Sequence, residues 1–556
     1  MKKWIPSPNI KISNQFEDII NCDKSLIILA GPGAGKTEIL AQKSSYLLTT
    51  GKCPWPKKIL CLTFKNEASK NIKNRVFSRT KNTSRFSSYT FHGFANSILS
   101  RFKTVLPENI RPNDSFEIFF GKGKENESTK NKIHINLVIG YAIKILESND
   151  DIRNMISDSY KYIFIDEFQD TTDEQYRLIT TIFNRNINNI ICVGDINQSI
   201  MIWAGADTNI FNKFSQDFNP ETLLLTENHR SSDELKKSLN NFLPYIEKGT
   251  TPGKNEFSSD NLKILFFDNE LSEADFLAEE ISFHIENGGN ASDYCILTKQ
   301  FSDQYSSKIT TKLALRNIST LQFNELQDAL SEPIGRLFTC ILYAYLDSTP
   351  KEWGNFTDII LEMNNIYDDD DDAEYNLVTS ISDFISKSKK ENDLSTIEDI
   401  IKLIKATFSH IGSKKIRSRW IQYQNISYLN KVWKTLELHL RNTYNSVSNK
   451  SFTPSVFSGE GSVHIMNIHK CKGLEYKHVI LLGFEDQAFW SYDDKEFGER
   501  CVIYVALSRA KEKITVTFVN NRSTRKKNEQ FSTIEKLTTV TNILTESCGF
   551  SLENKS

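Results

Sequence analysis

The sequence lacks the features that mark several large classes of protein. Its 556 residues contain no apolar run near the roughly 18 residues that a membrane-spanning helix needs. The opening residues, MKKWIPSPNIKIS, hold no apolar segment typical of a secretory signal. The nine cysteines form no C-x-x-C pair, so neither a zinc ribbon nor an iron–sulfur cluster is indicated. Free thiols in a reducing compartment, and no membrane partner, predict a cytoplasmic protein.

An excess of charge of one sign is also missing, because 68 basic and 70 acidic residues give a net charge of −2. Composition alone therefore does not indicate a nucleic-acid partner. Basic residues do gather between Lys65 and Arg85, with Glu67 as the one acid among them. This segment either contacts a phosphate backbone or forms a solvated helix face. The acidic run Asp368–Asp372 and the basic run Arg522–Lys527 predict exposed loops.

The most informative segment that is present is LIILAGPGAGKT, residues Leu26–Thr37. An apolar run of strand length ends in a glycine-rich turn, and a Lys-Thr pair opens a helix-like segment. Such a turn wraps nucleotide phosphates in backbone N–H groups, while the lysine adds charge and the threonine hydroxyl ligates Mg²⁺. An ordinary strand-to-helix turn is the alternative, and Ala30 replaces the usual first glycine. The predicted phosphate-binding residues are Gly31, Pro32, Gly33, Ala34, Gly35, Lys36 and Thr37.

A second apolar run, YIFIDEFQD at Tyr162–Asp170, ends in two adjacent acids. A buried parallel strand delivers such acids to the carboxyl edge of the sheet, where open α/β folds bind ligands. We expect Asp166 to hold Mg²⁺ and Glu167 to orient and deprotonate the attacking water. A strand followed by an acidic helix start would explain the pair alone. Together with the phosphate loop, the pair predicts a nucleotide hydrolase.

These two segments and seven others resemble, in the same order, the motifs of the UvrD/Rep-type superfamily 1 DNA helicases. The seven are KISNQFEDII (11–20), ILCLTFKNEASKNIKNRV (59–76), SSYTFHGF (87–94), ICVGDINQSIMIWAGA (191–206), LLLTENHRSS (223–232), VHIMNIHKCKGLEYKHVILLG (463–483) and GERCVIYVALSRAKEKI (498–514).

The resemblance implies ATP and Mg²⁺ as cofactors and gives roles to further side chains. Gln15 is expected to read the adenine edge, Glu475 to touch the ribose and Gln198 to sense the γ-phosphate. Arg230 and Arg509 are the implied arginine fingers, which complete a catalytic set with Lys36, Glu167 and Gln198. The implied partner is single-stranded DNA or a junction of single and double strands. Its expected contacts are Phe64, His92, Trp203 and His469.

The chain also departs from the family pattern. Glu38, still an expected nucleotide-binding residue, stands where an arginine usually packs on adenine, and His229 replaces a stacking tyrosine. Ala204 and Asn467 stand where arginine and threonine are usual. The hydrolytic set is intact while the base clamp is altered, so the preference for one nucleobase is expected to be relaxed.

The alternation of strand-like and helix-like segments predicts an α/β fold. With the resemblance, it implies two RecA-like parallel-sheet domains in tandem, each with a mainly helical insertion. The expected domains are 1A at 1–100 and 160–222, insertion 1B at 101–159, 2A at 223–330 and 455–535, insertion 2B at 331–454, and a tail at 536–556. The expected strands lie at 26–29, 59–64, 162–165, 190–193 and 223–226, then at 262–267, 294–298, 463–468, 479–482 and 514–519, with a helix at 133–147.

The expected activity is that of an ATP-dependent single-stranded DNA translocase or helicase, and the resemblance implies 3′→5′ movement. One alternative is a DNA-stimulated, end-sensing NTPase that unwinds little and acts with a separate nuclease against phages. The UvrD-like subunit of Gabija-type defence systems resembles this layout. The other alternative is a non-hydrolysing DNA-binding scaffold, against which the intact catalytic set argues.

Overall fold

The computed structural model describes residues 4–555, except 8–9, 11, 81–82, 115, 120–122, 185–186, 324, 365–370, 421–422, 424, 448 and 526–529. The chain divides into two compact units. The first unit combines Met1–Asp268 with Ile468–Ser556, and the second is Asn269–Asn467. Most of the acidic run at 368–372 and the two lysines of the basic run at 522–527 lie outside the described residues.

The first unit contains a six-stranded sheet in the order β3-β2-β6-β7-β1-β8. Every pair of neighbours in it is parallel. The predicted strands are all confirmed, and β3 is added to them because Phe86–Thr90 pairs alongside β2. The strands are β1 Leu26–Ala30, β2 Lys58–Thr63, β3 Phe86–Thr90, β6 Tyr160–Ile165, β7 Asn189–Gly194 and β8 Glu221–Leu225.

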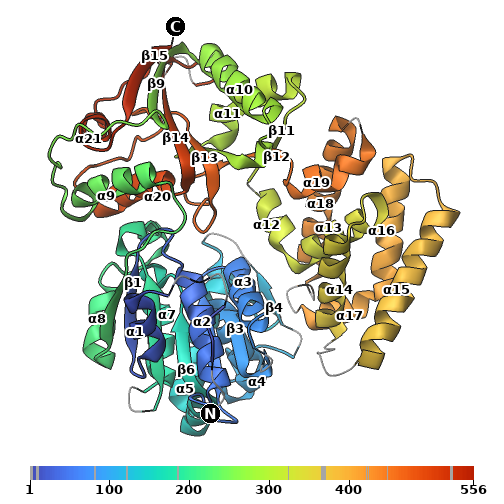
Figure 1. Cartoon of the computed structure of the whole chain (residues 1–556). Helices are drawn as coiled ribbons and strands as arrows, with labels where there is room; N and C mark the ends of the chain where they lie inside the picture. Colours follow the sequence, from blue (N-terminus) through green and yellow to red (C-terminus); the bar gives the residue numbers. More distant parts are fainter. Residues whose placement is uncertain are drawn as a thin grey trace. The chain divides into compact units, whose positions relative to one another are not determined.

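Helices cover both faces of this sheet (Figure 1). Successive strand residues enter opposite cores, as a period of two requires: Ile27 packs in one hydrophobic cluster and Ile28 in the other. The first cluster includes residues of α4, α5, α7 and α8, and the second includes residues of α1, α2 and α3. The helices that follow or precede these strands are α1 Asn14–Asn21, α2 Lys36–Thr49, α3 Asn66–Phe77, α4 Phe91–Phe102, α5 Ile135–Ser148, α6 Asp150–Ser159, α7 Asp173–Ile182, α8 Ile210–Phe218 and α9 Asp233–Lys248.

The expected first insertion contains α5, which confirms the predicted helix at 133–147, and a two-stranded parallel ribbon. The ribbon pairs β4 Glu117–Phe119 with β5 Lys132–His134. Its short strands carry no clear alternation of apolar and polar residues, which is why the sequence did not predict them.

The first unit also contains four neighbouring strands in the order β13-β14-β9-β15. The pairs β13–β14 and β9–β15 are parallel. Residues 536–556, expected as a tail, supply helix α21 and the edge strand β15. The elements are β9 Leu262–Asn269, β13 Tyr476–Leu481, α20 Phe497–Leu507, β14 Ala510–Asn521, α21 Thr538–Glu546 and β15 Ser551–Lys555.

The prediction that the basic run after β14 is a solvated loop is wrong for its two arginines. Arg522 is 1% exposed and Arg525 is 7% exposed. The cause is Glu485, a fully buried carboxylate whose oxygen lies 2.7 Å from Arg522 Nε. A buried charge needs a partner of opposite sign, and the loop supplies it.

The second unit contains the strands β11-β12-β10, all parallel, and a large helical part. Helices α13 to α19, which form the bundle drawn in Figure 1, share one hydrophobic core that includes Phe338, Ile404 and Leu436. Among the described residues, no helix is long and apolar enough to cross a membrane. The elements are α10 Glu270–Glu286, β10 Tyr294–Thr298, α11 Ser302–Leu315, β11 Ser319–Gln322, α12 Glu325–Ser331, α13 Pro333–Leu346, α14 Pro350–Asn364, α15 Asp371–Glu391, α16 Ile397–Ile411, α17 Ser413–Arg419, α18 Ile426–Ser446, α19 Thr453–Ser458 and β12 Ser462–Asn467.

Candidate nucleotide-binding site

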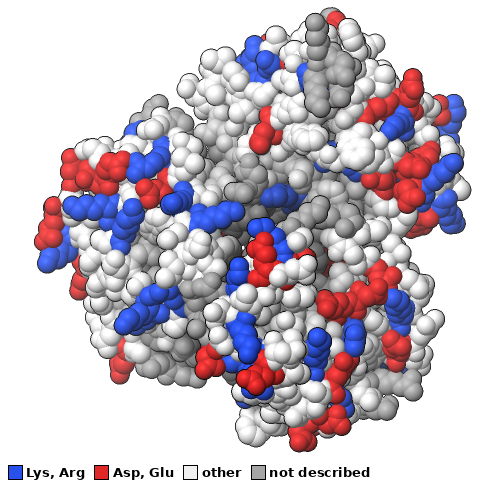
Figure 2. Space-filling view, turned by 180° about the vertical axis from the view of Figure 1, so that it is seen from behind, with Lys and Arg blue, Asp and Glu red and all other residues white. Residues whose placement is uncertain are grey.

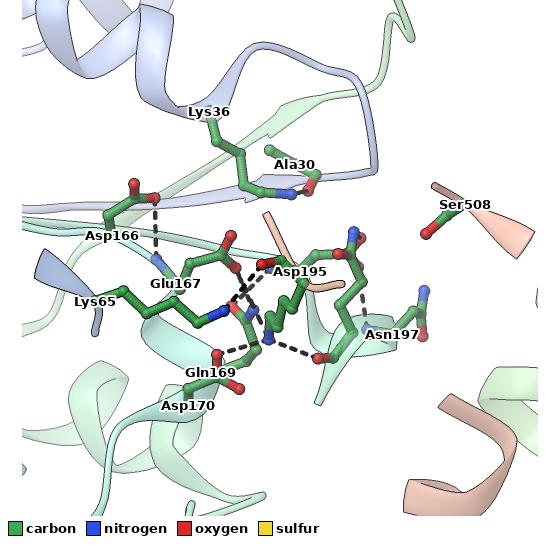
Figure 3. Close-up of polar contacts among 12 residues, drawn as sticks. Ala30, Lys36, Lys65, Asp166, Glu167, Gln169, Asp170, Asp195, Asn197 and Ser508 are labelled. Carbon is green, nitrogen blue, oxygen red and sulfur yellow. Dashed lines mark hydrogen bonds and ion pairs between the residues drawn. The ribbon is translucent and has the colours of Figure 1, made fainter. Parts of the chain in front are cut away.

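The predicted phosphate loop joins β1 to the N-terminus of α2 in the first unit. Gly33 and Gly35 have φ values of 73° and 81°, a left-handed conformation that glycine adopts without strain. A Cβ atom on Gly33 would lie 2.2 Å from Asn228 Oδ1, so no larger residue fits there. The ammonium of Lys36 donates to the carbonyl oxygens of Ala30, at 3.1 Å, and Gly31, at 3.3 Å (Figure 3). The loop therefore has the form of a phosphate cradle at a helix N-terminus.

The two predicted carboxylates follow β6 and face this loop. Thr37 Oγ1 donates to Asp166 Oδ2 at 3.5 Å, so a hydroxyl and a carboxylate, both hard oxygen donors, lie side by side. Hard oxygen donors of this kind are the ligands that Mg²⁺ prefers, so the predicted metal site stays a prediction with a fitting donor set. Glu167 has a φ of 53°, a left-handed conformation that costs a non-glycine residue about 1–2 kcal/mol. Such strain commonly marks a functional position.

The two adjacent carboxyl groups have opposite pKa shifts. Burial, followed by the charge of Glu167, raises the pKa of Asp166. Burial also acts to raise the pKa of Glu167, but the cations Lys472 and Lys36 outweigh it, so that the pKa of Glu167 is lowered. Glu167 is thus ionised at neutral pH, and Asp166 is a carboxylate that gains from a nearby cation. This donor chemistry fits a bound Mg²⁺ at Asp166 and a general base at Glu167.

A hydrogen-bond network connects the carboxylates to the segments near β7 and β14. Figure 3 draws the part of it around Glu167, Gln169 and Asp195. Gln169 Nε2 donates to Glu167 Oε2 at 2.6 Å, and Gln169 Oε1 accepts the Asp195 N–H at 3.0 Å. Gln198, in the 3-10 turn Ile196–Gln198, donates to Asp195 Oδ2 at 2.6 Å. Its Oε1 accepts from Arg509 Nη2 at 2.8 Å. Two predicted catalytic residues, Gln198 and Arg509, are therefore in direct contact.

Lys472 lies at the centre of this network and was not singled out from the sequence. Its side chain is 6% exposed, and its ammonium lies 2.6 Å from Asp170 Oδ2 and 4.0 Å from Glu167 Oε2 and donates to the Gln198 carbonyl at 2.8 Å. Burial, which the charge of Lys472 opposes, raises the pKa of Asp170 to about 6. The signal was available, because Lys472 stands three residues before Glu475 inside a quoted motif. What the sequence does not give is the spatial meeting of Lys472 and Asp170.

Arg230 approaches the same region from the turn after β8. Its Nε lies 2.5 Å from Glu475 Oε2, and its Nη1 donates to the Ser508 carbonyl at 3.4 Å. Glu475 also pairs with Lys511 at 2.8 Å. The two expected fingers, Arg230 and Arg509, are brought to adjacent segments, where burial and then the charge of Arg509 lower the pKa of Arg230. Contact of Glu475 with a ribose stays a prediction.

The residues expected around the base are held by different partners. Gln15 Oε1 accepts the Thr226 N–H at 3.2 Å, and its Nε2 donates to the Thr226 hydroxyl at 3.2 Å. Glu38, on the first turn of α2, pairs with Arg75 at 2.8 Å and with Arg79 at 3.0 Å. His229 is half-exposed. Glu38 is therefore paired with two guanidinium groups, one from α3 and one from the segment after it, where the family usually has a single arginine.

Two of the expected DNA-contacting residues follow neighbouring strands. Phe64 comes directly after β2, and His92 lies in the first turn of α4, just after β3. The two strands pair with Thr63 opposite Thr90, so both residues lie at the carboxyl edge that also carries Asp166. His469 is half-buried, and the side chain of Trp203, in the 3-10 turn Ile202–Ala204, lies outside the described residues. Their contact with DNA stays a prediction.

Much of the positive charge between Lys65 and Arg85 is used inside the protein. Besides the two arginines paired with Glu38, Arg85 donates to the carbonyl of Cys53 at 2.6 Å, and Lys65 donates to that of Lys472 at 3.1 Å. On the face drawn in Figure 2, basic and acidic side chains are interspersed. Much of the charge of this segment is therefore paired inside the protein and not presented to a phosphate backbone.

A glycine-rich loop at a helix N-terminus, with two carboxylates at the edge of a parallel sheet, defines a P-loop nucleotide-binding protein. Two family models match the chain: the UvrD/REP helicase N-terminal domain over 12–119 and 105–219, and the UvrD-like helicase C-terminal domain over 223–327 and 347–521. The chain belongs to the UvrD-like family of ATP-dependent DNA helicases. The fold class and the family predicted from the motifs are both confirmed.

Curated relatives agree with this family at modest identity. A probable DNA helicase II homolog of Mycoplasma capricolum is 24% identical, over 91% of this chain and 84% of the relative. The ATP-dependent DNA helicase PcrA of Staphylococcus epidermidis and that of Staphylococcus aureus are each 24% identical, over 92% of this chain and 83% of the relative. The similarity thus extends over nearly the whole chain.

Proposed function

We propose that the protein is an ATP-dependent single-stranded DNA translocase and DNA helicase that moves 3′→5′. The contact of Gln198 with Arg509 carries this proposal, because it links the segment after β7 to the segment before β14 beside the carboxylates. A motor needs such a link, since hydrolysis at one place must move another part of the chain. The direction of movement rests on the family resemblance.

The hydrolytic step would use this chain's own charges. The N–H groups of the phosphate loop and Lys36 would bind the phosphates, and Thr37 and Asp166 would hold Mg²⁺, which supplies positive charge beside them. Glu167, ionised at neutral pH, orients the attacking water and takes its proton. Arg230 and Arg509 place positive charge on the γ-phosphate, for which Arg230 must leave Glu475.

The DNA-dependent part of the cycle would use stacking. Phe64 and Trp203 are proposed to stack on bases, with His92 and His469 beside them, because stacking tolerates any sequence. We further propose that domains 1A and 2A, with the boundaries expected from the sequence, alternately grip the strand while 1B and 2B are the insertions. The proposed partners are single-stranded DNA and junctions between single-stranded and duplex DNA. The proposed location is the cytoplasm.

The test combines two assays on the full chain. ATP hydrolysis is measured with and without single-stranded DNA, and strand displacement is measured on duplexes with either a 3′ or a 5′ tail. DNA-stimulated hydrolysis with displacement only from the 3′ tail supports the proposal. Stimulated hydrolysis without displacement would favour the end-sensing NTPase that acts with a separate nuclease in phage defence. Absence of hydrolysis would leave a DNA-binding scaffold.

A further inference from the structure

The turn that carries Arg230 is fixed to the phosphate loop by a side chain to which no role has been given. Asn228 Oδ1 accepts the N–H of Arg230 at 2.8 Å and the N–H of Ser231 at 3.1 Å. The neighbouring His229 N–H donates to the Gly33 carbonyl at 3.0 Å. The main chain of the turn is thus bonded both to Asn228 and to the loop.

Asn228 is also in tight contact with the loop. A Cβ atom on Gly33 would lie 2.2 Å from Asn228 Oδ1 and 2.7 Å from Arg230 Cβ. The position of the turn therefore requires glycine at 33, and a shift of the loop must move the turn. Gly31, by contrast, has no atom within 4 Å of its would-be Cβ.

The other side of the turn is anchored to the start of β14. Ser231 Oγ donates to the Ala510 carbonyl at 3.1 Å, and the Ser232 N–H donates to the Lys511 carbonyl at 2.7 Å. Ser231 is buried. The segment Asn228–Ser232 consequently spans from the phosphate loop to the strand that follows Arg509.

The side chain of Arg230 is held less rigidly than its main chain. Its guanidinium pairs with Glu475, whose own side chain is 40% exposed and shared with Lys511. Exchange of this carboxylate for a phosphate needs rotation of the side chain alone, because the main chain at 230 is already fixed beside the loop. A group fixed in this way loses little freedom when it meets its ligand.

We propose that Asn228 is a positioning residue for hydrolysis, which sets Arg230 against the phosphate loop; this rests on the proposed hydrolytic function. Asn228 touches no reacting atom in this assignment. It acts by fixing the position of the Arg230 main chain. A displacement of a catalytic side chain by about 1 Å lowers the rate of the reaction by up to about a hundredfold.

The experiment compares Asn228→Ala with a matched control, Asn269→Ala. Asn269 also accepts two backbone N–H groups, from Leu271 at 3.0 Å and Ser272 at 3.1 Å, but it caps α10 in the second unit. Both variants are expected to lower the melting temperature by a few degrees. Only Asn228→Ala is expected to lower kcat for ATP, by about tenfold or more, with the affinity for ATP in calorimetry changed less than threefold.

A double-mutant cycle with Arg230→Ala separates positioning from general stability. If Asn228 acts through Arg230, then Asn228→Ala causes no further loss of kcat in the Arg230→Ala background, measured with radiolabelled ATP to resolve slow rates. An equal fold loss in both backgrounds, or a kcat within twofold of wild type for Asn228→Ala alone, would overturn the proposal. An inactive wild-type protein that still binds ATP would instead refute the proposed function.

Discussion

The phosphate end and the base end of the nucleotide site differ in how they depart from the family pattern. At the phosphate end, Lys36, Thr37, Asp166, Glu167 and Arg509 all match it, and contacts through Gln198 and Lys472 lead from Arg509 to Glu167. At the base end, Glu38 and His229 replace the usual arginine and tyrosine. There Glu38 is paired with Arg75, on α3, and with Arg79, which follows that helix.

The comparison indicates which physical demands are strict. Phosphates carry fixed charges, and hydrolysis develops more charge at defined atoms, so each donor must lie at one place. A base offers a flat surface and an edge, to which a cation or a ring can be brought from several directions. The predictions below test whether the first end is as strict, and the second as tolerant, as this difference implies.

The largest effect is expected from the hydrolytic charges. Lys36→Ala and Glu167→Gln should each lower kcat for ATP by about a hundredfold or more. Lys36→Ala removes charge from the phosphates, so ATP affinity should fall as well. Glu167→Gln keeps the shape of the site, so ATP should still bind and should remain bound without being hydrolysed. Steady-state hydrolysis and calorimetric ATP binding are the measurements. A rate near that of wild type for either variant would refute the assigned site.

The next effect concerns the two fingers. Arg230→Ala and Arg509→Ala should lower ATP hydrolysis by about tenfold to a thousandfold, because both are assigned to charge that develops on the γ-phosphate. Affinity for single-stranded DNA without nucleotide should stay within about threefold of wild type. Fluorescence anisotropy with a labelled oligonucleotide measures it. A parallel loss of this affinity would mean that the arginine contacts the DNA backbone.

The difference between the two ends also explains what the sequence could predict. The phosphate loop and the carboxylates were predictable because each motif is local: an apolar strand run followed at once by the functional residues. The pairing of Glu38 with Arg75 joins residues 37 positions apart, and the pairing of Lys472 with Asp170 joins residues 302 apart. No local pattern encodes such contacts.

The strands that the sequence missed have a similar cause. β15, SLENK, alternates exposed and half-exposed residues at a sheet edge, so it has no buried apolar face to reveal it. β3, FSSYT, has one fully buried residue, Phe86, and is likewise an edge strand. Both owe their structure to pairing with a neighbouring strand, which composition does not show.

A smaller effect is expected from pH at the phosphate end. Since burial and Glu167 raise the pKa of Asp166, this carboxyl remains partly protonated at a pH where an ordinary aspartate is ionised. Mg²⁺ requires the ionised form, so the Mg²⁺ concentration for half-maximal hydrolysis should rise several-fold between about pH 8 and about pH 6. Hydrolysis titrated with Mg²⁺ at each pH measures this. An unchanged requirement would contradict the assignment of Asp166.

The same group gives a stability effect with a defined sign. A folded-state pKa above the unfolded value stabilises the protein below the unfolded pKa, and this contribution is lost as pH rises through the folded pKa. Without Mg²⁺, Asp166→Asn should therefore raise the melting temperature at neutral pH relative to wild type, and the gain should shrink towards acidic pH. Thermal melts across this range measure the difference, with Asp158→Asn, at an exposed position, as the control variant.

The smallest effect is expected at the base end. Each stacking or cation–π contact is worth about 0.5–2 kcal/mol, so the loss of the usual arginine and tyrosine should narrow discrimination between ATP and other triphosphates. Wild type should therefore hydrolyse GTP or deoxynucleotides measurably, although Gln15 still favours adenine.

Glu38→Arg restores the family residue and removes the ion pairs with Arg75 and Arg79, so it should raise the preference for ATP by about threefold to thirtyfold. Lys73→Gln is the control. Lys73 lies on α3, as Arg75 does, but its ammonium lies over the Phe77 ring, so this variant should leave the preference for ATP unchanged. Comparison of kcat/KM among the triphosphates decides the matter: a preference of wild type for ATP of about a thousandfold, near 4 kcal/mol, would show that the base end is as strict as the phosphate end.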